Sequence, residues 1–273
     1  MPVIDANASV DPRAEIAADV EIGPYCVVGP HVRLSAGVRL ESHVHLTGHT
    51  TIGQRTRIYP FASLGTPPQS VKYRGGPTRL VIGNDCDIRQ YVTINTGTED
   101  AGGLTTVGDR CFLMAASHVG HDCQVGNNVT IANNVLLGGH VEVGDHVVFG
   151  GLCTVHQFVR VGESAMVAGF SGLSFDLIPF GLARGRIAVL NGLNVVGMRR
   201  RGLPRDVIHR IRRLYRHLFL GEGTLERRLS TLDPEFAEDE LAQKILTFIR
   251  AGGKRPLLSK TKEAANEPDE TGP

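Results

Sequence analysis

Residues 119–144 read VGHDCQ VGNNVT IANNVL LGGHVE VG, and an aliphatic side chain occupies the first position of every hexad. A period of six fits neither the 3.6-residue repeat of an amphipathic helix nor the two-residue alternation of a half-buried strand. It is typical of a solenoid in which each hexad forms one flat side and three hexads complete a coil of 18 residues. Each hexad sends an aliphatic and a small side chain inward, and glycine or polar residues turn the corner.

The same hexads extend in both directions from this stretch, from Ile4 to Leu173. They are interrupted twice, and we expect ejected loops at about 65–81 and 98–106. Loops that leave a solenoid tend to gather on its functional face. The sequence therefore predicts a mainly β fold, with a parallel β-helix over residues 1–190 that carries two loops.

The cysteines support this assignment, because all of them fall at the small inward position of a hexad. A small apolar side chain at such a position has a packing role, and an odd number without paired spacing argues against disulfides. The residues concerned are Cys26, Cys86, Cys111, Cys123 and Cys153.

Charge and hydropathy narrow the class of protein. The 273 residues carry a net charge of +1, so no overall field points to nucleic acid, and no nucleic-acid partner is expected. The first residues contain no basic stretch followed by an apolar run, and no segment approaches the ~18 apolar residues that span a membrane. We therefore expect a cytoplasmic protein without a membrane span.

The hexads fade after Leu173, and helical signals follow. Pro204 stands where a helix would start, and apolar residues recur at helical spacing over 207–219. Further helical segments are expected at 225–232 and 238–251. The sequence thus predicts an α-helical domain over 191–253 and a disordered tail over 254–273.

Arginine is concentrated at the start of this helical part, with a single acid, Asp206, among the arginines. This pattern is typical either of a solvated helix face or of a docking surface for an acidic macromolecule, such as an acidic carrier protein. The arginines are Arg199, Arg200, Arg201, Arg205, Arg210, Arg212, Arg213 and Arg216.

Histidines gather in the middle of the repeat, and the coil length places them. His121 and Gly139 are 18 residues apart, and so are Asp122 and His140, so each pair should stack in one column of neighbouring coils. Gln157 is the next member of the first column. The sequence predicts a compact polar site on the outer surface, with an imidazole beneath a glycine amide.

Such a site suits acyl transfer. A histidine can remove the proton of an attacking hydroxyl, a carboxylate can hold the productive tautomer, and a free backbone N–H can stabilise the oxyanion at a thioester carbonyl. Solvated surface histidines are the simpler interpretation. Zinc is another, because His118, His121 and His140 could supply three ligands.

Ordered short motifs also run along the chain up to the tail. They are Ile22-Gly23-Pro24-Tyr25-Cys26, Val28-Gly29-Pro30-His31-Val32, Lys72-Tyr73, Gly102-Gly103-Leu104-Thr105, the run from His118 to Asp122, Ala132-Asn133-Asn134, Gly139-His140, Val155-His156-Gln157-Phe158, Gly192-Leu193-Asn194 and Arg200-Arg201-Gly202. In this set the chain resembles the acyl-[acyl-carrier-protein]–UDP-N-acetylglucosamine O-acyltransferase family, whose members begin lipid A biosynthesis.

The resemblance implies a left-handed β-helix, a homotrimer with active sites between subunits, and transfer of a (3R)-hydroxyacyl chain from acyl carrier protein to the 3-position of UDP-N-acetylglucosamine. It implies no cofactor and no metal. His121 matches the catalytic base and Gly139 the oxyanion amide, with Asp122 beside them. Gly169 matches a position that limits acyl length, where glycine suggests a longer chain. Positions matching substrate or carrier contacts are Lys72, His118, His140, His156, Gln157, Asn194, Arg200 and Arg201.

Two segments depart from the family pattern near the acceptor. The family commonly has Gln-Asp before Lys-Tyr, where this chain has Gln69-Ser70, and His-Arg-Gly-Thr, where it has Asn95-Thr96-Gly97-Thr98. Loss of the carboxylate that a 3-hydroxyl would use motivates a hypothesis: Ser70 faces a 3-amino analogue of the UDP-sugar, and an amide forms.

Other classes remain open at this point. The N-acyltransferase of the same pathway normally has a separate domain before its β-helix, whereas hexads here begin at Ile4. Acetyl-CoA-dependent hexapeptide transferases usually lack the helical end. Hexapeptide-repeat zinc carbonic anhydrases and a non-enzymatic structural solenoid are more distant alternatives.

Overall fold

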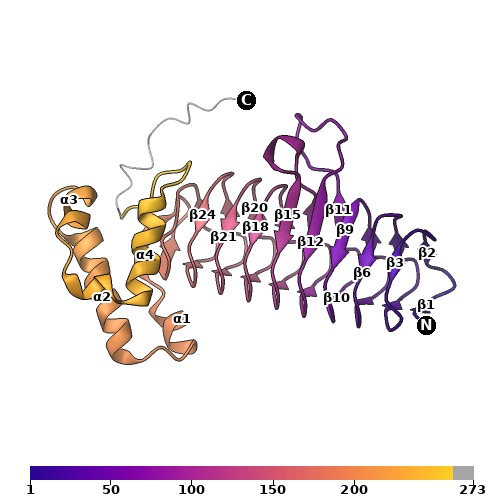
Figure 1. Ribbon diagram of the computed structural model, residues 1–273, viewed down its shortest axis with the longest axis horizontal. Helices are drawn as coiled ribbons and strands as arrows, with labels where there is room; N and C mark the ends of the chain where they lie inside the picture. The colour runs from indigo at the N-terminus through magenta and orange to yellow at the C-terminus, as the bar shows by residue number, and fades with distance from the viewer. Residues whose placement is uncertain (261–273) are drawn as a thin grey trace.

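A computed structural model describes residues 1–260 as a long β-helix that ends in a bundle of short helices (Figure 1). Three sheets of 11, 9 and 8 strands run along the solenoid, and every third strand in the sequence is a neighbour within a sheet, except at the end of the 11-stranded sheet. The pairing is parallel with a shift of one coil, as in His118↔Leu136 and Val119↔Leu137. This is the three-sided coil of 18 residues that the hexads predict.

The strands are short, since each occupies part of one hexad. The first sheet contains β1 (Val3–Ile4), β4 (Glu21–Ile22), β7 (Arg39–Leu40), β10 (Arg57–Ile58), β13 (Asp87–Ile88), β16 (Phe112–Leu113), β19 (Thr130–Ile131), β22 (Val148–Phe149), β25 (Met166–Val167), β27 (Gly181–Arg184) and β28 (Val189–Leu193). The second contains β2 (Ser9–Val10), β5 (Val27–Val28), β8 (His45–Leu46), β11 (Ser63–Thr66), β14 (Thr93–Asn95), β17 (His118–Val119), β20 (Leu136–Leu137), β23 (Thr154–Val155) and β26 (Gly172–Leu173). The third contains β3 (Glu15–Ile16), β6 (Arg33–Leu34), β9 (His49–Ile52), β12 (Arg79–Ile82), β15 (Leu104–Val107), β18 (Gln124–Val125), β21 (Glu142–Val143) and β24 (Arg160–Val161).

The core is a continuous column of mainly aliphatic side chains from every strand except the exposed β1, with smaller residues at the corners. All five cysteines are free and buried in it, as their position in the hexads predicts. Few aromatic residues enter this column, and Phe149 and Phe180 are the largest of its fully buried side chains. The small residues let the three sheets approach closely enough to exclude water.

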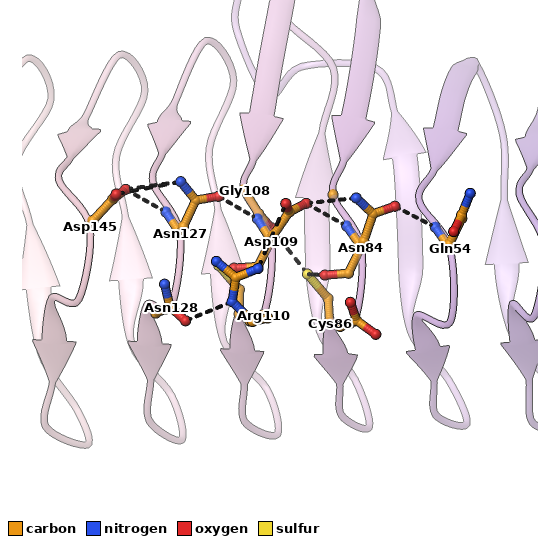
Figure 2. A network of polar contacts seen from close by, with 12 residues as sticks. Gln54, Asn84, Cys86, Gly108, Asp109, Arg110, Asn127, Asn128 and Asp145 are labelled. Carbon is orange, nitrogen blue, oxygen red and sulfur yellow. Dashed lines mark hydrogen bonds and ion pairs between the residues drawn. The ribbon is translucent and has the colours of Figure 1, made fainter.

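A left-handed backbone conformation and a hydrogen-bonded ladder shape the corners. Many corner residues adopt the left-handed backbone region without being glycine, among them Asp122, His140 and Phe158 at φ of 60°, 62° and 66°. A second corner carries a ladder of Asn and Asp side chains, shown in Figure 2. There the N–H of Asp109 donates to Asn127 Oδ1 at 2.8 Å, and the N–H of Asn127 donates to Asp145 Oδ1 at 2.7 Å.

The two ejected loops leave the solenoid side by side, over β11, β12 and β15 (Figure 1). The first runs from the end of β11 at Thr66 to the start of β12 at Arg79. The second runs from Asn95 to Leu104 and contains a short 3-10 turn, η1 (Glu99–Ala101). Both lie within a few residues of the expected positions.

The C-terminal part is helical, with α1 (Val195–Arg200), α2 (Arg205–Leu220), α3 (Leu225–Ser230), η2 (Pro234–Ala237) and α4 (Glu240–Ala251). Pro204 precedes α2, as its position predicts. An antiparallel pair, β27 and β28, closes the solenoid first, and β28 continues past the expected boundary at 190 to Leu193. Within residues 1–260, no helix is long and apolar enough to cross a membrane.

The prediction of disorder from residue 254 onward is wrong for residues 254–260, while 261–273 lie outside the described residues. Leu258 is 2% exposed, and its N–H donates to the carbonyl of Asp176 at 2.8 Å. The N–H of Leu190 donates to the carbonyl of Ser259 at 2.8 Å. This C-terminal strap, residues 252–259, therefore packs along the end of the solenoid.

Candidate active site

His121 and Gly139 stack in one column, as the 18-residue coil predicts. His121 follows β17, and Gly139 follows β20 one coil further on. A Cβ placed on Gly139 would lie 2.5 to 3.0 Å from three atoms of the His121 ring, so only glycine fits above the imidazole. Among the described residues the N–H of Gly139 donates to no backbone carbonyl, whereas that of Gly138 donates to Val155 at 2.9 Å.

Asp122 is the partner of this histidine. Its Oδ2 lies 2.8 Å from His121 Nδ1. The N–H and hydroxyl of Thr98 donate to Asp122 Oδ1 and Oδ2 at 2.8 and 2.7 Å. The N–H of Asp122 donates to the hydroxyl of Thr105 at 2.8 Å. His121 and Thr98 therefore hold the carboxylate, and Thr105 holds the backbone of Asp122.

The sequence predicted a site on the outer surface, but the His121–Asp122 pair is buried. His121 is 8% exposed and Asp122 is 6% exposed. The second ejected loop covers them: Gly97 comes so close that an added Cβ would meet Asp122 Oδ1 at 2.6 Å. Periodicity places a residue on a coil but does not show what an ejected loop folds over.

The electrostatics favour an ionised Asp122 and neutral side chains at His140 and His118. Burial pushes the pKa of Asp122 upward, but the hydrogen bonds from His121 and Thr98 together outweigh it and lower that pKa. Burial lowers the pKa of His140, partly offset by the charge of Asp122. Burial also lowers the pKa of His118. Asp122 is thus an anion at neutral pH that can accept the Nδ1–H of His121.

His140 continues the site into the next coils. Its Nδ1 lies 3.8 Å from Asp122 Oδ2, and its ring meets that of His121 edge-on at 5.0 Å. Phe158, one coil further, stacks on His140 at 4.4 Å, and the Lys254 ammonium lies 4.2 Å from the Phe158 ring. Asp122, His140, Phe158 and Lys254 line a cavity of about 470 Å³. A cavity of this size is within the range of small-molecule sites.

The other histidines of the prediction lie at the edge of this site. His118 Nδ1 lies 2.8 Å from the hydroxyl of Thr93. Exposed His156 is contacted by Arg255 of the C-terminal strap, whose guanidinium lies 2.7 Å from its Nδ1 and also donates to the carbonyl of Gln157 at 3.1 Å. Gln157 itself is exposed, in the column above Gly139.

The remaining predicted residues do not meet His121 within one chain. Ser70 and Lys72 lie on the first loop, where the N–H of Lys72 donates to Ser70 Oγ at 3.3 Å. Gly169 is exposed near the helical end of the solenoid. Among residues 1–260, no hydrogen bond or ion pair joins any of them to His121.

Asn194 and Arg201 already have structural partners. Asn194 is buried, accepts the N–H of Gly197 at the start of α1 and donates to the carbonyl of Ser164 at 2.9 Å. Arg201 pairs with Glu163 at 2.9 Å, whereas Arg200 is exposed. These contacts fix α1 on the last coils.

The zinc interpretation named His118, His121 and His140 as ligands, but the structure groups a different set. Potential ligand atoms of His121, Asp122 and His140 lie within 4.8 Å of one another, and His118 is not among them. In this group His121 Nδ1 faces the carboxylate rather than a shared centre. Within one chain, His118 therefore does not join His121 and His140 as a third ligand.

Sequence reasoning missed Thr98, Thr105 and Lys254. Thr98 lies in the ejected loop and Lys254 in the segment expected to be disordered, so neither belongs to the repeat. Thr105 and Asp122 are 17 residues apart, one less than a coil, because the 18-residue register places Thr105 opposite Cys123, the neighbour of Asp122. Of the three, only Thr105 could have been found from the sequence, by looking for hydroxyl residues about one coil length from Asp122.

Comparison with known protein families gives two matches. Residues 176–258 match the second domain of UDP N-acetylglucosamine O-acyltransferase. Residues 1–36 and 104–139 match the bacterial transferase hexapeptide, described as six repeats.

Curated relatives and solved structures agree with these matches. The acyl-[acyl-carrier-protein]–UDP-N-acetylglucosamine O-acyltransferase of Rhizobium rhizogenes is 51% identical over 77% of this chain and 78% of its own. The protein of the same name from Azorhizobium caulinodans is 53% identical over 81% of both. The UDP-N-acetylglucosamine acyltransferase of Campylobacter jejuni superposes with a TM-score of 0.89 at 39% identity, over 94% of this chain and 100% of that one.

Proposed function

The chain belongs to the acyl-[acyl-carrier-protein]–UDP-N-acetylglucosamine O-acyltransferase family, and we propose that it transfers a (3R)-hydroxyacyl chain from acyl carrier protein to the 3-hydroxyl of UDP-N-acetylglucosamine. This is the first step of lipid A biosynthesis. The fold is the left-handed β-helix of these enzymes. The observation that carries the proposal is the buried His121–Asp122 pair beneath Gly139.

The chemistry follows from these three residues. Asp122 accepts the Nδ1–H of His121, which leaves Nε2 free as the base. Nε2 takes the proton of the 3-hydroxyl as its oxygen attacks the thioester carbonyl of the acyl-phosphopantetheine arm. The N–H of Gly139 stabilises the oxyanion, and such a donor is typically worth about 10²–10³ in rate. Collapse of the intermediate breaks the C–S bond, and the leaving thiolate takes the proton from His121.

The proposed substrate contacts surround this centre. His140, which borders the cavity, and His118 lie next to the catalytic pair. His156, Gln157 and Gly169 follow toward the helical end, along the path proposed for the acyl-pantetheine arm.

Ser70 and Lys72 on the loop, and Asn194, Arg200 and Arg201 at α1, do not meet His121 in one chain. We therefore propose a homotrimer in which a neighbouring subunit completes the site. The structural bonds of Asn194 and Arg201 suggest that both act by holding α1 in place, with Arg200 free to reach a phosphate.

The acidic carrier protein is proposed to dock on the arginines of α1 and α2. Arg210 and Arg213 are engaged with Asp239 and with Asp233 and Glu235. Arg199, Arg205 and Arg212 instead line a hollow of about 260 Å³ together with His209 and Ile208. Positive charge around an apolar floor suits an acidic protein surface.

The acceptor is proposed to be the 3-hydroxyl sugar. The curated relatives are named O-acyltransferases, which does not favour the 3-amino hypothesis raised by Ser70. No cofactor is needed, because the acyl group arrives already activated as a thioester. With soluble substrates of this kind, we propose a cytoplasmic location.

An acyl-transfer assay tests the function. Purified protein is mixed with 3-hydroxyacyl carrier proteins of several chain lengths and with either UDP-N-acetylglucosamine or its 3-amino analogue. We expect the ester product with the 3-hydroxyl sugar as the preferred acceptor. Preferential turnover of the amino sugar would overturn the acceptor assignment, and no transfer to either sugar would overturn the function.

A further inference from the structure

The carboxylate of the catalytic pair is held by a residue outside the repeat. Thr98 donates through its N–H to Asp122 Oδ1 at 2.8 Å and through its hydroxyl to Oδ2 at 2.7 Å. Oδ2 is also the atom that faces His121 Nδ1. Thr98 is 7% exposed, so water does not compete strongly for these bonds. Two fixed donors on one carboxylate set its plane, and the plane sets the direction of the imidazole.

The next residue faces the other way, toward the first loop. Glu99 Oε1 accepts the N–H of Gly76 at 2.6 Å and that of Arg74 at 3.2 Å. Backbone hydrogen bonds, from its own N–H and from Gly76, lower the pKa of Glu99, so it is ionised at neutral pH. These bonds hold the loop a few residues beyond Lys72.

The residues just before Thr98 bind both ends of the first loop. Where the loop begins, Asn95 Nδ2 donates to Thr66 Oγ1 at 2.9 Å and to the carbonyl of Pro67 at 3.0 Å. Where it ends, the hydroxyl of Thr78 donates to Thr96 Oγ1 at 2.8 Å. Residues 95–99, which we call the bracket, therefore contact the start, the far side and the end of the loop.

We propose that the bracket couples the acceptor loop to the catalytic base, with Thr98 as a positioning residue for the His121–Asp122 pair and Glu99 as a positioning residue for the loop that carries Ser70 and Lys72. This inference rests on the proposed function, because the loop is taken to bind the sugar nucleotide. Because Thr98 contacts the catalytic pair and the adjacent Glu99 contacts the loop, the bracket would keep the acceptor hydroxyl in register with the base. Such register matters, since a displacement of about 1 Å can cost about 10²-fold in rate.

The coupling predicts separable kinetic effects for the two residues. Thr98→Val removes the hydroxyl donor at similar volume, and we expect kcat to fall on the order of 10-fold with the KM for the UDP-sugar little changed. The carboxyl of Asp122 should also titrate at higher pH in this variant, because its pKa loses a hydrogen bond that lowers it. Thr98→Ser keeps the hydroxyl and should restore both.

Glu99→Ala should instead raise the KM for the UDP-sugar on the order of 10-fold with kcat little changed. Glu99→Gln keeps an acceptor oxygen and should lie in between. Thr106→Val is the matched control: within residues 1–260 its hydroxyl bonds only Gln124, at 2.7 Å, on the outer face of the same solenoid. We expect wild-type kinetics for it, and thermal unfolding of every variant identifies any that fail to fold.

A second readout does not need turnover. Hydrogen exchange at the Arg74 and Gly76 amides should accelerate in Glu99→Ala but not in Thr98→Val. The His121 ring-proton resonance should shift in Thr98→Val but not in Glu99→Ala. Equal kinetics for Thr98→Val and Thr98→Ser, or unchanged exchange in Glu99→Ala, would overturn the coupling. If the variants gave the expected exchange and resonance changes but the wild type had no transferase activity, the bracket would stand and the proposed function would be overturned.

Discussion

At the scale of single residues, the site depends on a turn that most side chains avoid. Asp122 and His140 adopt left-handed φ values of 60° and 62°, a region where Asn, Asp and His are enriched because they tolerate it best. The turn brings Asp122 Oδ2 back to within 2.8 Å of the ring of the preceding residue. The corner geometry of the coil therefore makes the His-Asp pair from two consecutive residues.

The column arithmetic could be done on the sequence, but the environment of the site could not. His121 beneath Gly139 follows from 18-residue coils. The burial of the pair and its bonds to Thr98 depend on how an aperiodic loop folds back, and no spacing rule describes that. Asn95 stands where the family commonly has histidine, and only the structure explains this difference. Its side-chain amide donates to Thr66 and to Pro67.

His118 gives a pH dependence of stability at this scale. Its pKa is lowered in the folded protein, mainly by burial, from an unfolded value near 6.5. Below about pH 6.5 the unfolded chain takes up a proton that the folded chain resists, so stability should fall as the pH drops from 7 toward 5 and level off below the folded pKa. Thermal unfolding across this range should show a shallower decline for His118→Gln.

His45→Gln is the matched control for that experiment. His45 makes a similar contact, with Ser63 Oγ at 3.3 Å, but is exposed. We expect its variant to keep the wild-type decline. If both variants behaved alike, burial of His118 would not be the cause.

At the scale of elements, the hexad is the unit that sequence reasoning handles well. Each hexad becomes a short strand and a corner, and the small position holds every cysteine. The C-terminal strap was missed for a physical reason: its packing rests on Leu257, Leu258 and backbone bonds to Asp176, which leave no periodic pattern. Its ends matter for the site, since Lys254 and Arg255 contact Phe158 and His156.

The corner ladder of Figure 2 predicts a stability effect. Asn127→Ala removes the oxygen that accepts the Asp109 N–H and the amide that donates to Asp145. Leaving a part-buried N–H without its partner should lower the free energy of unfolding by about 1–3 kcal/mol. Chemical denaturation measures it.

Asn133→Ala is the control for the ladder. Asn133 occupies the same place in its hexad but at another corner, where its side chain is exposed. Its replacement should change the free energy of unfolding by no more than about 0.5 kcal/mol. A loss at Asn133 as large as that at Asn127 would show that the ladder has no special role.

At the scale of the whole molecule, the solenoid separates the parts of the site along its length. The two ejected loops lie over β11, β12 and β15, and the helical domain lies at the far end of the axis (Figure 1). Within one chain, α1 makes no contact with His121. In the proposed trimer, a neighbouring subunit completes the site. The rigid column of coils is what would keep these distant parts in register.

The most direct measurement is the turnover of His121→Ala beside the wild type, on acyl carrier protein thioester and UDP-N-acetylglucosamine. We expect turnover to fall about 10²–10⁴-fold, the range for loss of a general base, with thermal unfolding little changed because the core column is untouched. Turnover within a few-fold of wild type in a folded variant would contradict it and remove His121 from the mechanism.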